Sequence, residues 1–273
     1  MKKKIILDPN ADFYDDALFQ PAFLDQEFLL AQECRPLRLQ MELLKPEVYL
    51  SKAGVNATVI VIGSARIPSP AKAKAEIEHL QQQSPIDQKA LKIAENKLHY
   101  SRYYEEAEKL GFLVTQFRGQ GEIERLHIVT GGGPSYMEAA NKGAEHAGGP
   151  SVALGVSLPH ELGPNRYVTP ELTFKFHYFA MRKMHFLIRA KAMVVFPGGL
   201  GTLDELVETL TLMQTGKIDR LPILIFARDF WEKLIDFNWL VETGMIAEND
   251  LKLFQYVETA EEAWGMIKAF YHL

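Results

Sequence analysis

The sequence predicts an α/β fold in which one doubly wound parallel sheet carries helices on both faces. Short apolar runs alternate with longer amphipathic segments from residue 57 to residue 273, as strands alternate with helices in such a fold. The run TVIVI at 58–62 is continuously apolar, which is typical of a parallel strand covered on both faces. Three of the runs lead into turns of small residues, so we expect a Rossmann-like arrangement.

The expected elements follow from these runs and from the residues that end them. We expect a helix at 87–110 that ends at Gly111, and helices at 181–190, 204–216, 229–244 and through Trp264 and Phe270. The strand-like segments are 58–62, 112–117, 126–130, 151–158, 172–179, 192–196, 222–227 and 252–258.

Two further segments lie outside this alternation. Residues 1–56 are aromatic-rich and broken by prolines, and 23–33 and 37–44 predict short amphipathic helices, so we expect an N-terminal helical extension. Residues 67–86 are polar and end in Ser84 and Pro85, and they are interpreted as an insertion in the main domain, 57–273.

Composition excludes several classes of protein. A net charge of −5 disfavours a protein that coats nucleic acid. Binding of single-stranded DNA is disfavoured for the same reason, and only salt-sensitive retention of DNA by the protein would support it. Cys34 is the only cysteine, so an intramolecular disulfide and a cysteine metal cluster are excluded. Neither a signal peptide nor a membrane span is indicated, which predicts a cytoplasmic protein with no membrane partner. No cofactor and no metal are expected.

Three turns of small residues are candidate ligand sites. They are GSAR at 63–66, TGGGPS at 130–135 and PGGLGT at 197–202. Bare backbone amides at the start of a helix favour an anion such as phosphate. Neither G-x-G-x-x-G nor the P-loop pattern is present, which disfavours a nicotinamide dehydrogenase and a P-loop phosphotransferase.

Two glutamates follow these turns at the spacing of a capping box. Thr202 precedes Glu205 by three residues, and Ser135 precedes Glu138 by three, so each glutamate could simply cap its helix. Alternatively, both carboxylates face one crevice, where they would accept hydrogen bonds from a ribose and stabilise positive charge at its anomeric carbon.

The motifs together resemble the LONELY GUY (LOG) family. The resemblance lies in PGGLGTLDE at 197–205, in the Arg-Lys pair of FAMRKMHFLIRAKAMVVF, and in GGGPSYMEAANKGA at 131–144, and it covers about residue 58 to the end of the chain. NRYVTPELTFKFHYFAMRK is similar to longer bacterial members. Tyr136 and Glu138 depart from the common GGGxxGLMG pattern, and this departure bears on the base of the substrate.

The resemblance implies an enzyme, a phosphoribohydrolase that cleaves a nucleoside 5′-monophosphate, AMP or a cytokinin riboside monophosphate, into free base and ribose 5-phosphate. It implies a homodimer or higher homo-oligomer, and a nucleotide-binding catalytic domain at 57–273. The alternative is a non-catalytic carrier or sensor of a phosphorylated ligand, similar to molybdenum-cofactor carriers. The implied catalytic residues are Arg182, Glu205, Lys183 and Asp204, and the implied substrate-binding residues are Ser64, Arg66, Gly132, Gly133, Glu138, Gly198, Gly199, Gly201 and Thr202.

Other residues have structural explanations. His185 falls at helical spacing with apolar neighbours and is expected to be packed, whereas His160 and His177 are expected at the surface. A lysine that binds pyridoxal phosphate is not indicated. Phe174, Phe176, Tyr178 and Phe179 are expected in the core or a subunit contact, and Trp231, Trp239 and Trp264 in the core.

Overall fold

A computed structural model describes residues 20–121, 123–157 and 163–273. The described residues form two compact units, and the chain passes from the first to the second between Lys45 and Pro46. The predicted boundary between residues 56 and 57 stays a prediction, and His160 lies outside the described residues.

The first unit holds α1 (Gln26–Leu30) and the beginning of α2 (Arg35–Lys52), which continues into the second unit. The strands of the second unit are β1 (Ala57–Ile62), β2 (Leu126–Thr130), β3 (Val152–Val156), β4 (Thr173–Phe176), β5 (Ala190–Val195), β6 (Ile223–Phe226) and β7 (Gln255–Val257). Its further helices are α3 (Pro70–Gln81), α4 (Gln88–Gln116), α5 (Tyr136–His146), α6 (Phe179–Ile188), α7 (Leu200–Gln214), α8 (Arg228–Leu234), α9 (Phe237–Glu242) and α10 (Ala260–Phe270). Short 3-10 helices are η3 (Gln32–Cys34), η4 (Pro170–Leu172) and η5 (Glu248–Leu253).

The described strands form one seven-stranded sheet in the order β4-β3-β2-β1-β5-β6-β7, and every pairing is parallel. The central strand β1 pairs with β2 on one side and with β5 on the other. The strand order reverses at β1, so the carboxyl ends of these three strands border the crevice where ligands bind in open α/β sheets. The predicted α/β fold is confirmed.

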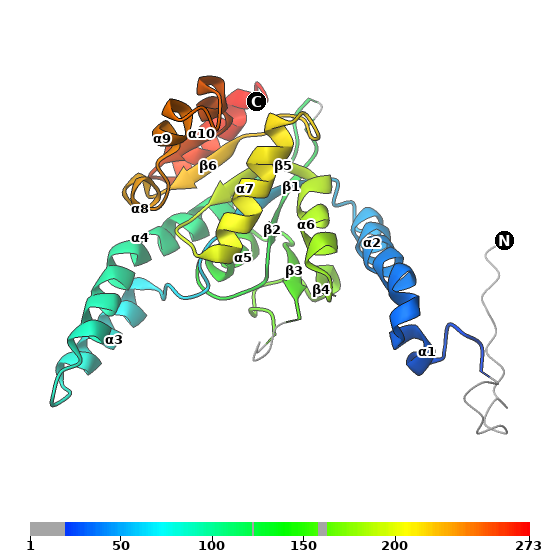
Figure 1. Cartoon of the computed structure of the whole chain (residues 1–273), viewed down its shortest axis with the longest axis horizontal. Helices are drawn as coiled ribbons and strands as arrows, with labels where there is room; N and C mark the ends of the chain where they lie inside the picture. The colour runs from blue at the N-terminus through cyan, green and yellow to red at the C-terminus, as the bar shows by residue number, and fades with distance from the viewer. Residues whose placement is uncertain (1–19, 122, 158–162) are drawn as a thin grey trace. The chain divides into compact units, whose positions relative to one another are not determined.

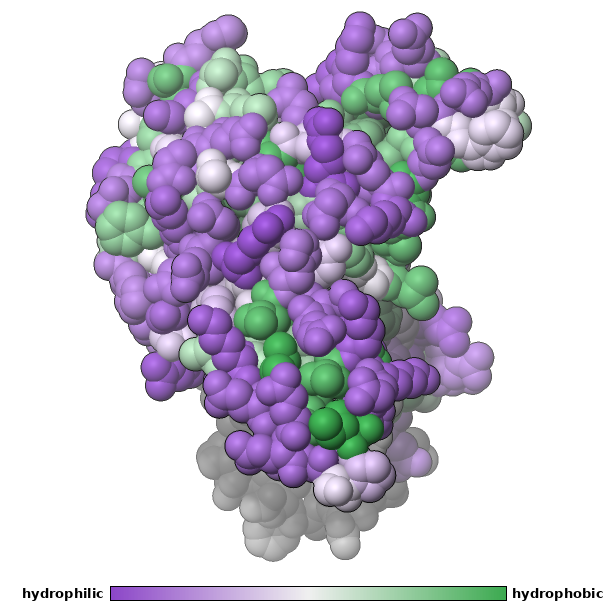
Figure 2. Space-filling view, turned by 90° about the vertical axis from the view of Figure 1, so that its left-hand side faces the viewer, coloured by the Kyte–Doolittle hydropathy of each residue, from purple (hydrophilic) through white to green (hydrophobic). Residues whose placement is uncertain are grey.

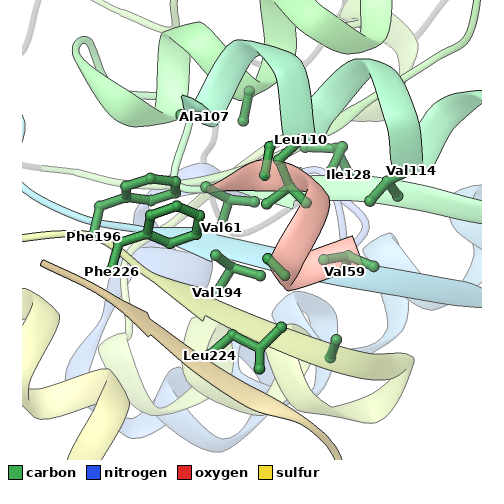
Figure 3. Packing of buried hydrophobic residues seen from close by; sticks show 14 of the residues in the cluster. Val59, Val61, Ala107, Leu110, Val114, Ile128, Val194, Phe196, Leu224 and Phe226 are labelled. Carbon is green, nitrogen blue, oxygen red and sulfur yellow. The ribbon is translucent and has the colours of Figure 1, made fainter. Parts of the chain in front are cut away.

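Helices cover both faces of the sheet, as Figure 1 shows. Alternate residues of β1 point to opposite faces, with Val59 and Val61 on one and Ile60 and Ile62 on the other. The first face packs against α4, α5 and α10, and the second against α6, α7 and α8. In Figure 3, Leu110 of α4 lies over Val61 in this first core.

The prediction that Gly111 ends a helix and that 112–117 is a strand was wrong. Helix α4 continues through Gly111 to Gln116. A Cβ on Gly111 would lie 2.2 Å from the carbonyl oxygen of Ala140 in α5. The glycine therefore serves the close packing of two helices, a requirement that local sequence does not reveal.

The predicted single helix at 229–244 is two helices. The carboxylate of Asp236 accepts a hydrogen bond from the backbone N–H of Trp239 at 2.9 Å and caps α9, so the chain ends α8 and starts again. Trp239 is consequently 59% exposed, which corrects its expected core position, whereas Trp231 is fully buried and Trp264 is half-buried.

The insertion at 67–86 forms helix α3, which packs against the first half of α4 as a helical hairpin. Lys97 of α4 pairs with Glu76 of α3 at 2.8 Å. Ile86 and Ile93 in the segment of this hairpin are exposed. Figure 2 shows a stripe of apolar residues in green between hydrophilic residues in purple on the side of the molecule that it presents. Within the described parts of the chain, none of the helices has the length and apolarity that a membrane crossing requires.

Candidate active site at the carboxyl edge of the sheet

The three turns of small residues come together at one edge of the sheet. They follow β1, β2 and β5, which are neighbours in the sheet. The backbone N–H of Ser64 donates to the carbonyl oxygen of Pro197 at 2.9 Å and joins the first turn to the third. On the other side, a Cβ on Gly131 would lie 3.9 Å from a guanidinium nitrogen of Arg182. The three turns therefore lie at the same edge of the sheet, and Arg182 lies beside the second of them.

The PGGLGT turn opens helix α7. Gly199 is the N-cap and no side chain caps the helix, so the amides of its first turn are left for a ligand. A Cβ on Gly198 would lie 2.2 Å from Oγ1 of Thr202, so packing explains this glycine. A Cβ on Gly199 or Gly201 would meet no atom within 4 Å. Packing therefore does not explain these two glycines, and the backbone here is open to the close approach of a ligand.

The GGG turn is held by its carbonyl groups. The side-chain amide of Asn165 donates to the carbonyl oxygens of Gly132 and Gly133, both at 3.1 Å, and to Oδ1 of Asn141 at 3.0 Å. The N–H of Gly132 donates to Oγ1 of Thr130 at 2.9 Å, and Gly132 has a φ of 75° that favours glycine. These bonds fix the path of the turn before α5 begins.

Neither predicted capping box forms. Thr202 lies inside α7, which begins at Leu200, so it does not occupy the N-cap position. Ser135 is the N-cap of α5 but has a φ of 70°, and its side chain makes no capping hydrogen bond. The structural explanation for Glu205 and Glu138 as capping-box residues is therefore wrong.

Arg182 and Glu205 form a buried ion pair between α6 and α7. A guanidinium nitrogen of Arg182 donates to Oε1 of Glu205 at 2.6 Å, and their side chains are 11% and 12% exposed. The guanidinium also lies 5.2 Å from the ring centroid of Phe179 and 5.7 Å from that of Phe186. Aromatic rings and the carboxylate together hold the arginine in one orientation.

Burial sets the protonation of this pair. It raises the pKa of Glu205 to about 7, because removal from water disfavours the charged carboxylate, and Arg182 only partly opposes the rise. Asp204 raises this pKa further through its nearby negative charge. A carboxyl group that titrates near neutral pH can accept and return a proton at that pH.

Lys183 and Asp204 form a second pair beside the first. The ammonium group of Lys183 lies 3.2 Å from Oδ1 of Asp204 and 3.2 Å from Oε2 of Glu208. Burial is the largest single influence on the pKa of Lys183 and lowers it, but the hydrogen bonds and charges of these two carboxylates together outweigh burial and raise this pKa. Lys183 is thus a positive charge held between carboxylates, an arrangement that does not favour an uncharged amine for Schiff-base chemistry.

Glu138 has a different partner from Glu205. It accepts a hydrogen bond from the hydroxyl of Tyr104 in α4 at 3.1 Å. Burial and the carboxylate of Glu138 raise the pKa of Tyr104, so this hydroxyl stays a donor. Glu138 lies beside Arg66 in a pocket of about 220 Å³ at the foot of the α3–α4 hairpin.

Tyr136, which departs from the common family motif, belongs to the core. Its ring stacks on Phe196 at 5.0 Å, and its hydroxyl donates to the carbonyl oxygen of Tyr100 at 2.9 Å. A Cβ on Gly63 would lie 2.8 Å from the Tyr136 ring. The tyrosine therefore packs beneath the first turn instead of contacting a ligand.

The remaining expectations for aromatic and histidine residues have mixed outcomes. His185 is buried, as expected, and its Nδ1 lies 3.5 Å from a carboxylate oxygen of Glu47. Phe174 and Phe176 are buried, whereas Phe179 is 47% exposed. The structure also adds Tyr104 and Asn165, which the sequence did not indicate as site residues, although Asn165 begins the motif NRYVTPELTFKFHYFAMRK. Ser135, expected only as a helix cap, has a buried hydroxyl without a hydrogen-bond partner in the described structure.

Taken together, the fold and the site define a Rossmann-like α/β protein with glycine turns and an arginine–glutamate pair at the carboxyl edge of its sheet. A family model described as "Possible lysine decarboxylase" matches residues 137–267. The chain is 31% identical over 144 residues to cytokinin riboside 5′-monophosphate phosphoribohydrolase LOG4 of Arabidopsis thaliana. The aligned segment covers 51% of this chain and 66% of the relative. The chain is 33% identical over 150 residues to the LOG enzyme of Oryza sativa subsp. japonica, which covers 53% and 60%.

These matches confirm the resemblance to the LOG family. The chain spans about two thirds or less of the length of these curated relatives. Among solved structures, TM1055 superposes over 78% of this chain and 99% of its own with a TM-score of 0.47 at 19% identity. The molybdenum cofactor carrier protein of Chlamydomonas reinhardtii does so over 78% and 96% with a TM-score of 0.44 at 18% identity.

Proposed function

We propose that the protein is a phosphoribohydrolase that cleaves the N-glycosidic bond of a nucleoside 5′-monophosphate. The substrate is AMP or a cytokinin riboside monophosphate, and the products are free base and ribose 5-phosphate. The observation that carries the proposal is the buried pair of Arg182 and Glu205, with a glutamate pKa of about 7, beside uncapped glycine turns. The names of its relatives support the same reaction.

The 5′-phosphate is proposed to bind the PGGLGT turn. The first amides of α7 and the positive end of its helix dipole would face the phosphate oxygens. Gly199 and Gly201 leave the space that the phosphate needs. This placement brings the ribose towards the pair formed by Arg182 and Glu205.

The chemical step needs one water molecule. As the bond from C1′ to the base nitrogen breaks, positive charge develops at C1′, and a water molecule adds there while it loses a proton. We assign Glu205 as the acceptor of this proton, because its pKa of about 7 suits proton transfer near neutral pH. The base leaves with the electron pair of the broken bond and takes up a proton, so that atoms and charge balance.

Arg182 has two roles in this proposal. Its hydrogen bond fixes the orientation of the Glu205 carboxylate. Its positive charge stabilises the carboxylate form that accepts the proton and balances charge on the phosphate or the leaving base. Lys183 and Asp204 complete the charged surroundings of the pair.

Base release tests the proposal directly. The protein is incubated with nucleoside monophosphates, the matching nucleosides and a cytokinin nucleotide, and free base is measured by chromatography. We expect release from monophosphates alone, and a loss of about 10² to 10⁴ in rate for Glu205→Gln. Glu242→Gln, which removes an exposed carboxylate in α9, is the matched control and should stay active.

Two other results would count against the enzyme. Tight nucleotide binding without base release from any substrate would favour the carrier or sensor. A Glu205→Gln variant as active as the wild type would remove Glu205 from the mechanism.

Activity should also rise with pH through about 7, because only the deprotonated carboxyl group accepts the proton.

We further propose that the protein forms a homodimer or larger homo-oligomer in the cytoplasm. A groove of about 860 Å³ lies along α6 and α7, and Phe179, Met184 and Ile188 line it although each is 45% to 47% exposed. An apolar surface of this kind is typical of an interface between chains. Light scattering should give a dimer or larger mass for the wild type, and Met184→Glu should shift the mass towards the monomer.

A further inference from the structure

The pocket at the foot of the α3–α4 hairpin is separate from the pair that carries the proposed chemistry. Its volume is about 220 Å³, which is room for a phosphoryl group and some water at roughly 30 Å³ for each water molecule. The residues that follow β1 form one wall, and the start of α5 forms the other. The wall after β1 includes Arg66 and, from the insertion, Lys72.

Ser135 lies in this pocket in an unusual state. It is 5% exposed, and its hydroxyl has no hydrogen-bond partner in the described structure. Its φ of 70° is rare for a residue other than glycine and places the backbone under strain. A buried hydroxyl without a partner is itself unfavourable, so a ligand that accepts its hydrogen bond would satisfy a group that the protein leaves open.

The start of α5 adds further donors. Ser135 does not cap the helix, so the amides of Tyr136, Met137 and Glu138 have no side-chain acceptor at the N-cap. A side-chain cap is present in some other helices, such as α4 with Asp87 and α10 with Thr259, and absent in α5. The uncapped amides of α5, like the Ser135 hydroxyl, are therefore hydrogen-bond donors that a bound anion can satisfy.

The charges around the pocket favour an anion. Arg66 and Lys72 contribute two positive charges, and neither forms an ion pair within the described part of the chain. Glu138 contributes one negative charge, and one of its oxygens already accepts a hydrogen bond from Tyr104. Two cations, a free hydroxyl and helix amides outweigh the single carboxylate.

We propose that this pocket is a second phosphate-type subsite, in which the Ser135 hydroxyl, the first amides of α5, Arg66 and Lys72 bind a tetrahedral oxyanion. The subsite goes beyond the proposed function, which already places the 5′-phosphate of the substrate at the PGGLGT turn. Its ligand is either an additional phosphoryl group of the nucleotide or a separate phosphate-bearing molecule. The insertion that carries Lys72 thereby gains a role in recognition.

Titration of the full chain with inorganic phosphate, followed by calorimetry, tests the subsite. We expect two binding events for the wild type, and a loss of affinity of about tenfold or more at one of them in Lys72→Met and in Ser135→Gly. Lys74→Met, which removes the same charge from an exposed position in α3 outside the pocket, should bind as the wild type does. Ser135→Gly should fold, because glycine adopts this φ readily.

The result that overturns the subsite is phosphate binding that neither variant weakens, or a single binding event in the wild type. Base release plays no part in this measurement, so a failure of the proposed hydrolysis would leave the result standing. Thermal melts check that each variant is folded.

Nucleotide binding then separates the two sources of the anion. Tighter binding of a nucleoside 3′,5′-bisphosphate than of the 5′-monophosphate, lost in Lys72→Met, assigns the pocket to a phosphoryl group of the nucleotide. The other result is that the bisphosphate and the monophosphate bind with equal affinity and that inorganic phosphate still binds when the monophosphate is bound. This result assigns the pocket to a separate phosphate-bearing molecule. If Lys72→Met weakens the monophosphate as strongly as it weakens phosphate, the pocket holds the single 5′-phosphate and a second subsite is overturned.

Discussion

Glu205→Gln should change the pH dependence of stability as well as the activity. Burial raises the pKa of the folded carboxyl group from 4.5 to about 7. Between these values the folded chain keeps a proton that the unfolded chain has released. The contribution of Glu205 to stability is therefore fully present below pH 4.5 and is lost as the pH rises through 7.

The size of this effect follows from the shift. Each pKa unit corresponds to about 1.4 kcal/mol, so between pH 5 and pH 8 the wild type should lose about 2 to 3 kcal/mol of unfolding free energy through this group. Glutamine has no charge to bury, so Glu205→Gln should not show this loss. Its stability relative to the wild type should therefore rise by about 2 to 3 kcal/mol between the two pH values.

Urea unfolding at pH 5 and pH 8 measures this double difference. Every other titrating group contributes equally to both proteins and cancels, and the exposed Glu242→Gln variant should give a double difference near zero. If the difference in unfolding free energy between the wild type and Glu205→Gln is the same at pH 5 and at pH 8, the reasoning is refuted. It would mean that Arg182 compensates the buried charge fully.

Three further predictions follow from the same contacts. Arg182→Met should move the acid limb of the activity profile to higher pH, because Arg182 holds down the pKa of Glu205; an unmoved limb in a pH–rate series would contradict this. Gly199→Ala should weaken phosphate binding in calorimetry without lowering the melting temperature, whereas Gly265→Ala in α10, also in open space, should leave binding unchanged. Glu47→Ala should cost about 3 kcal/mol in urea unfolding, because it leaves the buried Arg189 guanidinium without its carboxylate, and a loss near zero would contradict this.

The sequence was most informative where a requirement is local. Continuous apolar runs such as 126–130 predicted the buried strands of the parallel sheet, and β2 occupies that range. The position of glycine turns after β1, β2 and β5 also followed, since each turn directly continues an apolar run. These features depend on the next few residues of the chain, which a sequence displays.

The sequence was least informative where a requirement comes from a distant segment. Gly111 was expected to end a helix, and only its contact with Ala140 of α5 explains why a glycine stands inside α4. The hydrogen bond from Tyr104 to Glu138 joins residues 34 positions apart, and the bonds from Asn165 to the GGG turn span more than 30. No periodicity or motif encodes such pairs, because they depend on how elements pack.

The two glutamates show how one spacing can give two chemical roles. Each stands three residues after a hydroxyl residue, yet the helices begin at different points relative to that pattern. Glu138 is the third residue of α5, whereas Glu205 is the sixth of α7, because α7 begins before Thr202. Glu205 therefore lies beyond the position from which a glutamate can reach the N-cap, and its carboxylate meets Arg182 across the gap between two helices. The helix start, more than the motif itself, leaves Glu205 available for chemistry.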